Sequence, residues 1–210
     1  MQANHRIPAP TLARLATYFK TLGEAEAQGV RFLNSAKFEG LCGIAATQVR
    51  KDLSRFGELG KPGVGYEVST LRKHIKRILN LDETQRVAVI GAGRLGQALA
   101  GYPGLEEYSF QVVALFDSDP TKIGRKAGGM TIEDVACMAK RLPKTGAKIA
   151  VLTVPGSQAQ TAADAAIKAG ARWLLNFTTA LVRVPEGCMV RDVSFTQEFA
   201  VLSYYTKEKK

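Results

Sequence analysis

Hydrophobic residues recur along the chain with two different periods, which divide it near residue 82. In the first 80 residues they recur every three or four positions, which predicts amphipathic helices. From residue 86 onward, short apolar runs alternate with helical patterns, which predicts strands and helices in turn. We expect a helical domain over residues 1–82, an α/β domain over residues 83–193, and a final helical segment over residues 194–210.

The N-terminal pattern predicts four helices and one glycine-rich hairpin. The expected helices are one that stops at Gly23, two over residues 35–41 and 46–56, and a fourth that Ser69 caps. The short break at Gly43 between the second and third helices is typical of a helix-turn-helix. Four glycines and a proline between Gly57 and Tyr66 exclude a helix and indicate a tight hairpin, or wing.

The second pattern predicts a parallel, doubly wound sheet. Strands are expected over residues 86–90, 110–117, 130–132, 148–153, 173–176 and 189–193, and helices over residues 94–101, 133–142, 158–168 and 195–205. Ligands of such sheets bind beyond the carboxyl ends of the strands. The residues at those ends are Gly91, Asp117, Thr153, Val154, Pro155, Asn176, Phe177 and Thr178.

One of these strand ends carries a glycine motif, Gly91-Ala92-Gly93-Arg94-Leu95-Gly96. In such a motif the first glycine permits a tight turn, the second lets the main chain approach a pyrophosphate, and the third lets the helix pack closely. Asp117 ends the next strand, at about the offset of 20 residues where an acid binds an adenosine ribose. The motif therefore predicts a dinucleotide site; the alternative is an ordinary glycine turn followed by a capping aspartate.

Composition narrows the class of protein. The chain has 210 residues, of which 46% are hydrophobic and 23% charged, as in a globular protein of one or two domains. We expect neither a membrane span nor a signal peptide, because no apolar run is long enough. The three cysteines are odd in number and lack metal-site spacing, so we expect reduced thiols in a cytoplasmic protein.

The net charge of +10 is concentrated near the N-terminus. Residues 1–80 hold 13 basic and 6 acidic residues, whereas the remainder holds 16 and 13. This asymmetry indicates an anionic partner for the first domain, with nucleic acid the leading candidate and a solvated basic surface the alternative. The candidate DNA-contacting residues on the third helix and the wing are Gln48, Arg50, Lys51, Arg55, Lys61 and Gly63.

Several motifs together resemble the Rex family of redox-sensing transcriptional repressors, over nearly the whole chain. The most specific are the segment QVRKDLS at residues 48–54 and GVGY at residues 63–66. The others are GAGxxG at residues 91–96, FDxDPxKxG at 116–124, LTVP at 152–155, NFT at 176–178 and RVPEG at 183–187.

The resemblance implies a winged-helix domain, a Rossmann domain that binds NAD⁺ and NADH, and a C-terminal helix exchanged between the subunits of a homodimer. It implies a repressor that holds a palindromic double-stranded operator with NAD⁺ and leaves it when NADH binds. It also assigns Gly91, Gly93 and Gly96 to the pyrophosphate, Asp117 to the ribose, and Tyr102, Thr153, Pro155, Asn176 and Phe177 to the nicotinamide end.

This sequence departs from the family pattern at several positions. Ser194 stands where family members usually have an aspartate that pairs with an N-terminal arginine, here Arg14, so the usual coupling of NADH and DNA binding is in question. Glu198 is the candidate replacement for that carboxylate. Ala45 stands where a capping side chain is expected, which should weaken the start of the third helix by about 1 kcal/mol.

Two other functions are consistent with parts of the pattern. An NAD(H)-dependent oxidoreductase needs an acid–base group, but the two histidines, His5 and His74, lie outside the nucleotide domain. The Tyr205–Lys209 pair lies in a lysine-rich tail and is interpreted as a coincidence. A nucleotide-binding module with a winged helix for protein association is the third possibility. We expect no catalytic residue and no metal, and a preference for NAD over NADP because Asp117 would repel a 2′-phosphate.

Overall fold

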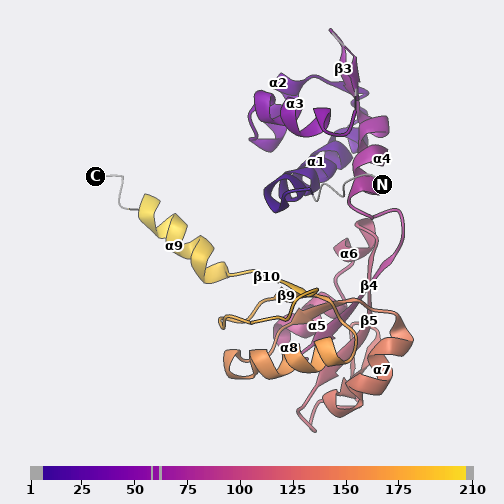
Figure 1. The fold of residues 1–210 in the computed structure, drawn as a ribbon, viewed down its shortest axis with the longest axis vertical. Helices are drawn as coiled ribbons and strands as arrows, with labels where there is room; N and C mark the ends of the chain where they lie inside the picture. Colours follow the sequence, from indigo (N-terminus) through magenta and orange to yellow (C-terminus); the bar gives the residue numbers. More distant parts are fainter. Residues whose placement is uncertain (1–6, 58, 62, 207–210) are drawn as a thin grey trace. The chain divides into compact units, whose positions relative to one another are not determined.

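A computed structural model describes residues 7–57, 59–61 and 63–206 of the chain. The chain divides into two compact units, Met1–Glu83 and Thr84–Lys210 (Figure 1). The expected first domain and final segment each include residues outside the described ranges, at 1–6 and 207–210.

The first unit is a winged helix. A three-stranded antiparallel sheet in the order β1-β3-β2 supports the hairpin predicted between Gly57 and Tyr66. Its elements are α1 (Ala9–Ala27), β1 (Phe32–Leu33), α2 (Ser35–Cys42), α3 (Ala46–Ser54), β2 (Gly60–Lys61), β3 (Gly65–Glu67) and α4 (Val68–Ile78). The two-residue strand β1 was not predicted, since two residues carry no periodicity.

A buried aromatic pair lies in the core of this unit. The rings of Tyr18 in α1 and Phe38 in α2 meet edge to face, with centroids 5.3 Å apart. Leu53 of α3 and Ile75 of α4 are also buried, so each helix contributes its apolar face to one core.

The prediction that the first helix stops at Gly23 was wrong, because α1 continues to Ala27. The side chain of Arg72 lies across α1 at this point, 3.4 Å from where a Cβ of Gly23 would be. Its guanidinium donates to Glu26 at 2.6 Å and lies over the ring of Phe19 at 5.0 Å. The glycine gives this arginine room to pack instead of ending the helix.

The start of α3 receives its cap from another helix. Ala45 has no side chain that could accept a hydrogen bond, as expected, but the carboxylate of Glu39 in α2 accepts from the Ala46 N–H at 3.0 Å. A negative group at a helix N-terminus also interacts favourably with the helix dipole. Asn34 caps α2, and the predicted cap at Ser69 was wrong, because α4 begins at Val68.

The second unit is the predicted doubly wound sheet. Its seven strands run in the order β10-β9-β8-β4-β5-β7-β6, and all pairs except β6–β7 are parallel. The strands are β4 (Gln85–Ile90), β5 (Phe110–Asp117), β6 (Lys126–Ala127), β7 (Met130–Asp134), β8 (Ile149–Leu152), β9 (Trp173–Asn176) and β10 (Met189–Asp192). The helices are α5 (Arg94–Ala100), α6 (Gly104–Glu107), α7 (Met138–Thr145), α8 (Ala159–Lys168) and α9 (Phe195–Tyr205), with short 3-10 turns η1 (Val135–Cys137) and η2 (Gly156–Gln158).

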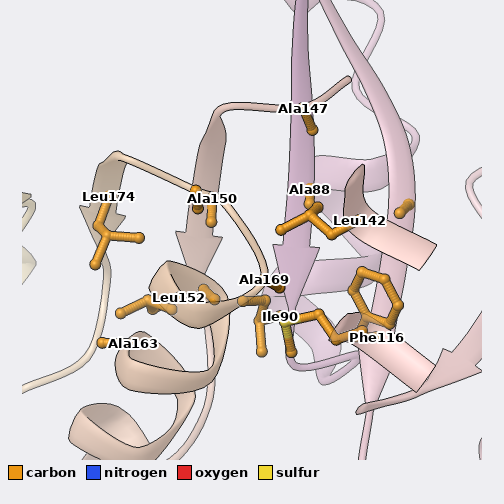
Figure 2. Packing of buried hydrophobic residues seen from close by; sticks show 14 of the residues in the cluster. Ala88, Ile90, Phe116, Leu142, Ala147, Ala150, Leu152, Ala163, Ala169 and Leu174 are labelled. Atoms are coloured by element: carbon orange, nitrogen blue, oxygen red, sulfur yellow. The ribbon is translucent and has the colours of Figure 1, made fainter. Parts of the chain in front are cut away.

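Alternate residues of the central strands face two separate cores. On β4, Ala88 and Ile90 face α7 and α8, whereas Val87 and Val89 face α5. Figure 2 shows the first of these cores, in which Ala163 of α8 packs onto the sheet close to Leu152. Alanines on α8 allow the helix to approach the strands closely, because a small side chain separates the two backbones.

The prediction of a helix over residues 133–142 was wrong at its start. Glu133 and Asp134 continue β7 in parallel register with Phe116 and Asp117. Asp134 then caps η1 by accepting from the Ala136 N–H at 2.8 Å, and α7 begins at Met138. Pairing with β5, rather than the local preference of these residues, decides this boundary.

The last helix has no buried residue. The exposed side chains among its eleven residues include Phe199, Leu202 and Tyr205. Ser194 caps it, since its hydroxyl accepts from the Gln197 N–H at 3.3 Å.

Among the described residues, no helix is long and apolar enough to cross a membrane.

The cap supplied by Glu39 gives a first prediction. Glu39→Ala should lower the free energy of unfolding of the first unit by about 0.5–1 kcal/mol, because the Ala46 N–H loses its acceptor. Glu39→Gln, the matched control, keeps an acceptor and should lose less. Adding Ala45→Ser to Glu39→Ala should restore stability, since serine caps the helix itself. Denaturant titrations followed by circular dichroism measure each step, and equal stability of Glu39→Ala and wild type would contradict the cap.

Candidate functional site

The glycine turn after β4 passes very close to the end of β8. Gly91 has a φ of +104°, and a Cβ at this position would lie 2.7 Å from the carbonyl carbon and oxygen of Thr153. A Cβ on Gly96 would collide with the Gly91 carbonyl oxygen. Both glycines are therefore required by the packing of the turn itself.

Gly93 differs from these two glycines. Its φ is −74°, which any residue adopts, and no other described atom comes within 4 Å of where its Cβ would be. Gly93 is also the N-cap of α5, where helix N–H groups have no intrahelical acceptor. The space above Gly93 is thus an open cradle in which an anionic group can approach main-chain donors.

Thr153 stabilises the turn through hydrogen bonds. Its hydroxyl oxygen lies 2.8 Å from the carbonyl oxygen of Gly91 and 3.1 Å from that of Ile90, so it donates to the turn. The Thr153 N–H donates to the Ile90 carbonyl at 2.9 Å. These bonds join the ends of β4 and β8, the place where the strand order reverses in a doubly wound sheet.

Asp117 is tied to the same turn. One carboxylate oxygen accepts from the Ala92 N–H at 2.7 Å and from the Lys122 ammonium at 3.1 Å, and the other accepts from the Asp119 N–H at 2.8 Å. Burial at 7% exposure raises the pKa of Asp117, but these hydrogen bonds outweigh it and hold the pKa below its usual range. The aspartate is therefore ionised and fixed in place at neutral pH.

A cleft of about 670 Å³ opens beside this turn. Of the residues predicted for cofactor binding, six line it: Gly91, Gly93, Asp117, Thr153, Val154 and Pro155. The apolar walls and the few convergent polar groups are typical of a small-molecule site. Its size and its carboxylate beside a glycine turn suit a nucleotide with a sugar and a phosphate.

The remaining predicted cofactor residues do not line this cleft. Tyr102 is 59% exposed and lines a separate recess with Pro103 and Met130. Asn176 is fully buried, and its amide group bonds to Thr178, Ala180 and Asp192, which secures the loop after β9.

The other residues lie around the turn and the loop. Phe177 packs against Phe195, with ring centroids 6.1 Å apart. Ala92 and Gly96 are buried beneath the turn, whereas Arg94 and Leu95 are exposed on the first turn of α5. Their contribution to a bound cofactor stays a prediction.

Polar residues that we did not predict also line the cleft, Lys122, Ser157, Gln158 and Thr161 among them. Lys122 bridges Asp117 and Asp119, with its ammonium 3.5 Å from the latter. Ser157, Gln158 and Thr161 line the wall formed by η2 and the start of α8. Lys122 follows Asp117 by five residues in the motif already noted, whereas the other three carry no signal in the sequence.

The winged helix has a groove of about 890 Å³ between α3 and the wing. Arg50 and Lys61, both exposed, line it together with Ser35 and Tyr66. Arg50 donates to the Ser35 hydroxyl at 2.6 Å, which joins two residues that line the groove. Of the other candidates, Gly63 lines the groove, Lys51 is exposed on α3, and Arg55 is exposed directly after the end of α3.

Gln48, the last candidate for DNA contact, belongs to a buried hydrogen-bond network. Its amide donates to Asp52, a carboxylate that also accepts from Arg14 and Tyr18. Arg14 thus has a partner within its own unit, with nitrogen–oxygen distances of 2.6 and 2.8 Å. Ser194 meanwhile caps α9.

The described residues contain no group of three or more histidine, cysteine or acidic side chains able to hold a metal ion. His74 lies in α4 of the first unit. His5 and Lys209 lie outside the described residues.

Comparisons with known proteins extend these observations. Residues 82–180 match the family model described as "CoA binding domain", and residues 6–54 match "Putative DNA-binding protein N-terminus". The Redox-sensing transcriptional repressor Rex of Chloroflexus aurantiacus is 39% identical over 205 residues, 98% of this chain and 97% of the relative. Its namesake in Thermus thermophilus is 42% identical over 199 residues, 95% and 93% of the two chains.

The chain is also similar to solved structures of a repressor. The chain resembles RSP, a Rex-family repressor, in complex with beta-NAD⁺ and operator DNA, with a TM-score of 0.90 and 30% identity over 97% of this chain and 94% of that one. It resembles RSP in complex with beta-NADH with a TM-score of 0.88 and 29% identity, over 97% and 96% of the two chains.

The different surroundings of Gly91 and Gly93 give a second prediction. Gly91→Ala should lower the free energy of unfolding by about 2 kcal/mol or more, because of its positive φ and the contact with Thr153. Gly93→Ala should lower the free energy of unfolding by less than about 1 kcal/mol, because the new Cβ would lie in open space. Denaturant titrations of the two variants provide the comparison. A loss at Gly93 as large as at Gly91 would refute the open cradle.

Proposed function

The chain belongs to the Rex family of redox-sensing transcriptional repressors, and from this premise we propose that it holds operator DNA with NAD⁺ and releases it with NADH. The similarity over 97% of the chain to a repressor in complex with both NAD⁺ and operator DNA carries this proposal. The relatives are named as repressors and not as enzymes.

The cleft beside the glycine turn is the proposed NAD(H) site. The open position above Gly93 has the shape that a pyrophosphate needs, since a Cβ there would fill it. Asp117, held in place by Ala92 and Lys122, would accept hydrogen bonds from the adenosine ribose. Lys122 compensates part of the aspartate's charge, so the preference for NAD over NADP stays a prediction.

The nicotinamide end would distinguish the two oxidation states by charge. NAD⁺ carries one more positive charge on its ring than NADH, and burying a charge in an apolar site costs free energy. Val154 and Pro155 give the cleft an apolar wall, and Phe177 adds a partly buried ring after the neighbouring strand, where its N–H donates to the Leu152 carbonyl at 3.0 Å. We assign Tyr102 and Phe177 to this end on the family resemblance.

The winged helix is the proposed operator-binding domain. Arg50 and Lys51 on α3, Arg55 directly after it and Lys61 on the wing are exposed, as contacts to phosphates and base edges require. If NADH closes the cleft and moves two such domains, the spacing of the half-sites they fit changes. A coupling of about 1–3 kcal/mol would shift operator affinity about 5- to 150-fold.

A homodimer is the proposed functional state. The helix α9 exposes apolar side chains along its whole length, with Phe199 at 69% and Leu202 at 58% exposure. Contiguous exposed apolar surface of this kind is typical of a subunit interface. Exchange of α9 between two subunits would cover it and give the two-fold symmetry that a palindromic operator needs.

Because the operator is chromosomal DNA, the proposed location is the cytoplasm.

Operator binding in the presence of each cofactor tests the proposed function. NADH should release the protein from a palindromic duplex in fluorescence anisotropy, whereas NAD⁺ should not. Binding should also weaken steeply with salt, as expected for several phosphate contacts. Gly93→Ala should still bind the duplex but respond to NADH only at much higher concentration, since its Cβ occupies the pyrophosphate cradle.

Two outcomes would contradict this function. Release of DNA by NADH in the Gly93→Ala variant at the wild-type concentration would place the cofactor elsewhere. Steady NADH oxidation with a carbonyl substrate would favour the oxidoreductase.

The dimer gives a further prediction. Leu202→Glu places a charge on the apolar face of α9 and should convert the dimer into monomers with weaker operator binding, because a buried unpaired charge destabilises an interface. Leu181→Glu is the matched control, since Leu181 is 89% exposed outside α9 and should not affect assembly. Light scattering during size-exclusion chromatography measures the mass. A dimeric Leu202→Glu protein would argue against an α9 interface.

A further inference from the structure

Asp52 is a buried charge at the centre of the winged helix. Only 1% of its surface is exposed, although it belongs to α3, the helix that the groove follows. One carboxylate oxygen accepts from the Nε of Arg14 at 2.6 Å and the hydroxyl of Tyr18 at 3.0 Å. The other accepts from the Nη2 of Arg14 at 2.8 Å and the amide of Gln48 at 2.9 Å.

This arrangement commits the side chain of Gln48 to one orientation. An ionised carboxylate can only accept hydrogen bonds, so Gln48 must turn its NH₂ group, not its carbonyl oxygen, toward Asp52. The positive charge of Arg14 keeps the carboxylate ionised, and burial prevents water from replacing the amide. In the described part of the chain, Gln48 makes no other side-chain hydrogen bond, so its carbonyl oxygen and one N–H remain available to a ligand.

Such a fixed pair matches one base edge better than the others. Adenine presents an acceptor and a donor in the major groove, which a glutamine amide meets with one N–H and its carbonyl oxygen. Guanine presents two acceptors at the same place, which an amide can satisfy only by rotating its carbonyl away. Gln48 lies in the first turn of α3, where residues of a recognition helix contact base edges.

We propose that Asp52 is a positioning residue for operator recognition, which holds the Gln48 amide so that it reads an adenine in each half-site. This inference rests on the proposed function, in which α3 enters the major groove. Asp52 itself touches no base. It acts through Gln48, and Arg14 and Tyr18 support it from α1.

The test is a base-preference profile. A palindromic duplex is first selected by the wild-type protein from a randomised library, and affinities are then measured for symmetric single-base-pair replacements. One position should prefer adenine over guanine about 5- to 150-fold. Gln48→Met, which keeps the length without the amide, should abolish the preference at that position alone. Asp52→Asn should reduce the same preference although Gln48 is present, since an asparagine permits both amide orientations.

Two control variants separate positioning from general weakening. Tyr18→Phe removes one donor from Asp52 but leaves the Gln48 contact, so it should lower the melting temperature and keep the adenine preference. Lys61→Ala should weaken binding to every duplex alike, as expected for a phosphate contact. An unchanged profile in folded Asp52→Asn, or in Gln48→Met, would overturn the proposal.

A measurement on the wild type covers the case in which Asp52→Asn does not fold. The side-chain amide of Gln48, assigned by its absence from the spectrum of Gln48→Met, should have an order parameter of about 0.85; a value below about 0.6 would overturn the proposal. Failure to select any duplex at all would instead count against the proposed function, and thus is distinguishable from failure of the Asp52 inference.

Discussion

The close approach of two main-chain segments, at Gly91 and Thr153, determines how the second unit can bind a ligand. The strands β4 and β8 are neighbours, and the chain leaves them toward opposite faces of the sheet, where α5 and α8 lie. A cleft can form at this point only if the turn after β4 packs closely against the end of β8. Gly91 and Gly96 permit this because side chains there would collide with main-chain atoms, and the hydroxyl of Thr153 secures the result.

Buried carboxylates organise both units in a similar way. Asp117 joins the end of β5 to the glycine turn through the Ala92 N–H, and Asp52 joins α3 to α1 through Arg14 and Tyr18. Each is surrounded by donors that keep the pKa below its usual range despite burial. A buried charge of this kind is costly unless every lone pair has a partner, so it specifies one arrangement of its neighbours. In both units that arrangement positions groups which we propose to contact a ligand.

The departures from the family pattern have local explanations. The carboxylate of Glu39 takes the place of the side chain that Ala45 lacks, from a different helix. Arg14, the arginine that would pair with an aspartate at position 194, instead binds Asp52 in its own unit, and Ser194 caps α9. Glu198 lies in the first turn of α9, where its charge suits the helix dipole. Arg14 thus donates to Asp52 and to Thr11, both inside the first unit.

The sequence by itself determined the fold class and much of the cleft. The apolar periods are local, so they predicted the winged helix, the doubly wound sheet and, to the residue, β5, β9 and α9. Glycine spacing likewise reports local geometry, which is why Gly91, Gly93 and Asp117 could be placed together.

Only the tertiary structure showed that Gly23 makes room for Arg72, that β5 pairing extends β7 to Asp134, and that Lys122, Ser157 and Thr161 join the cleft. Asn176 and Gln48 were likewise predicted as contacts, yet their hydrogen bonds with Asp192 and Asp52 became visible only in three dimensions. Such contacts join residues distant along the chain or on hidden faces of helices, and no periodicity along the sequence records which side chains meet there.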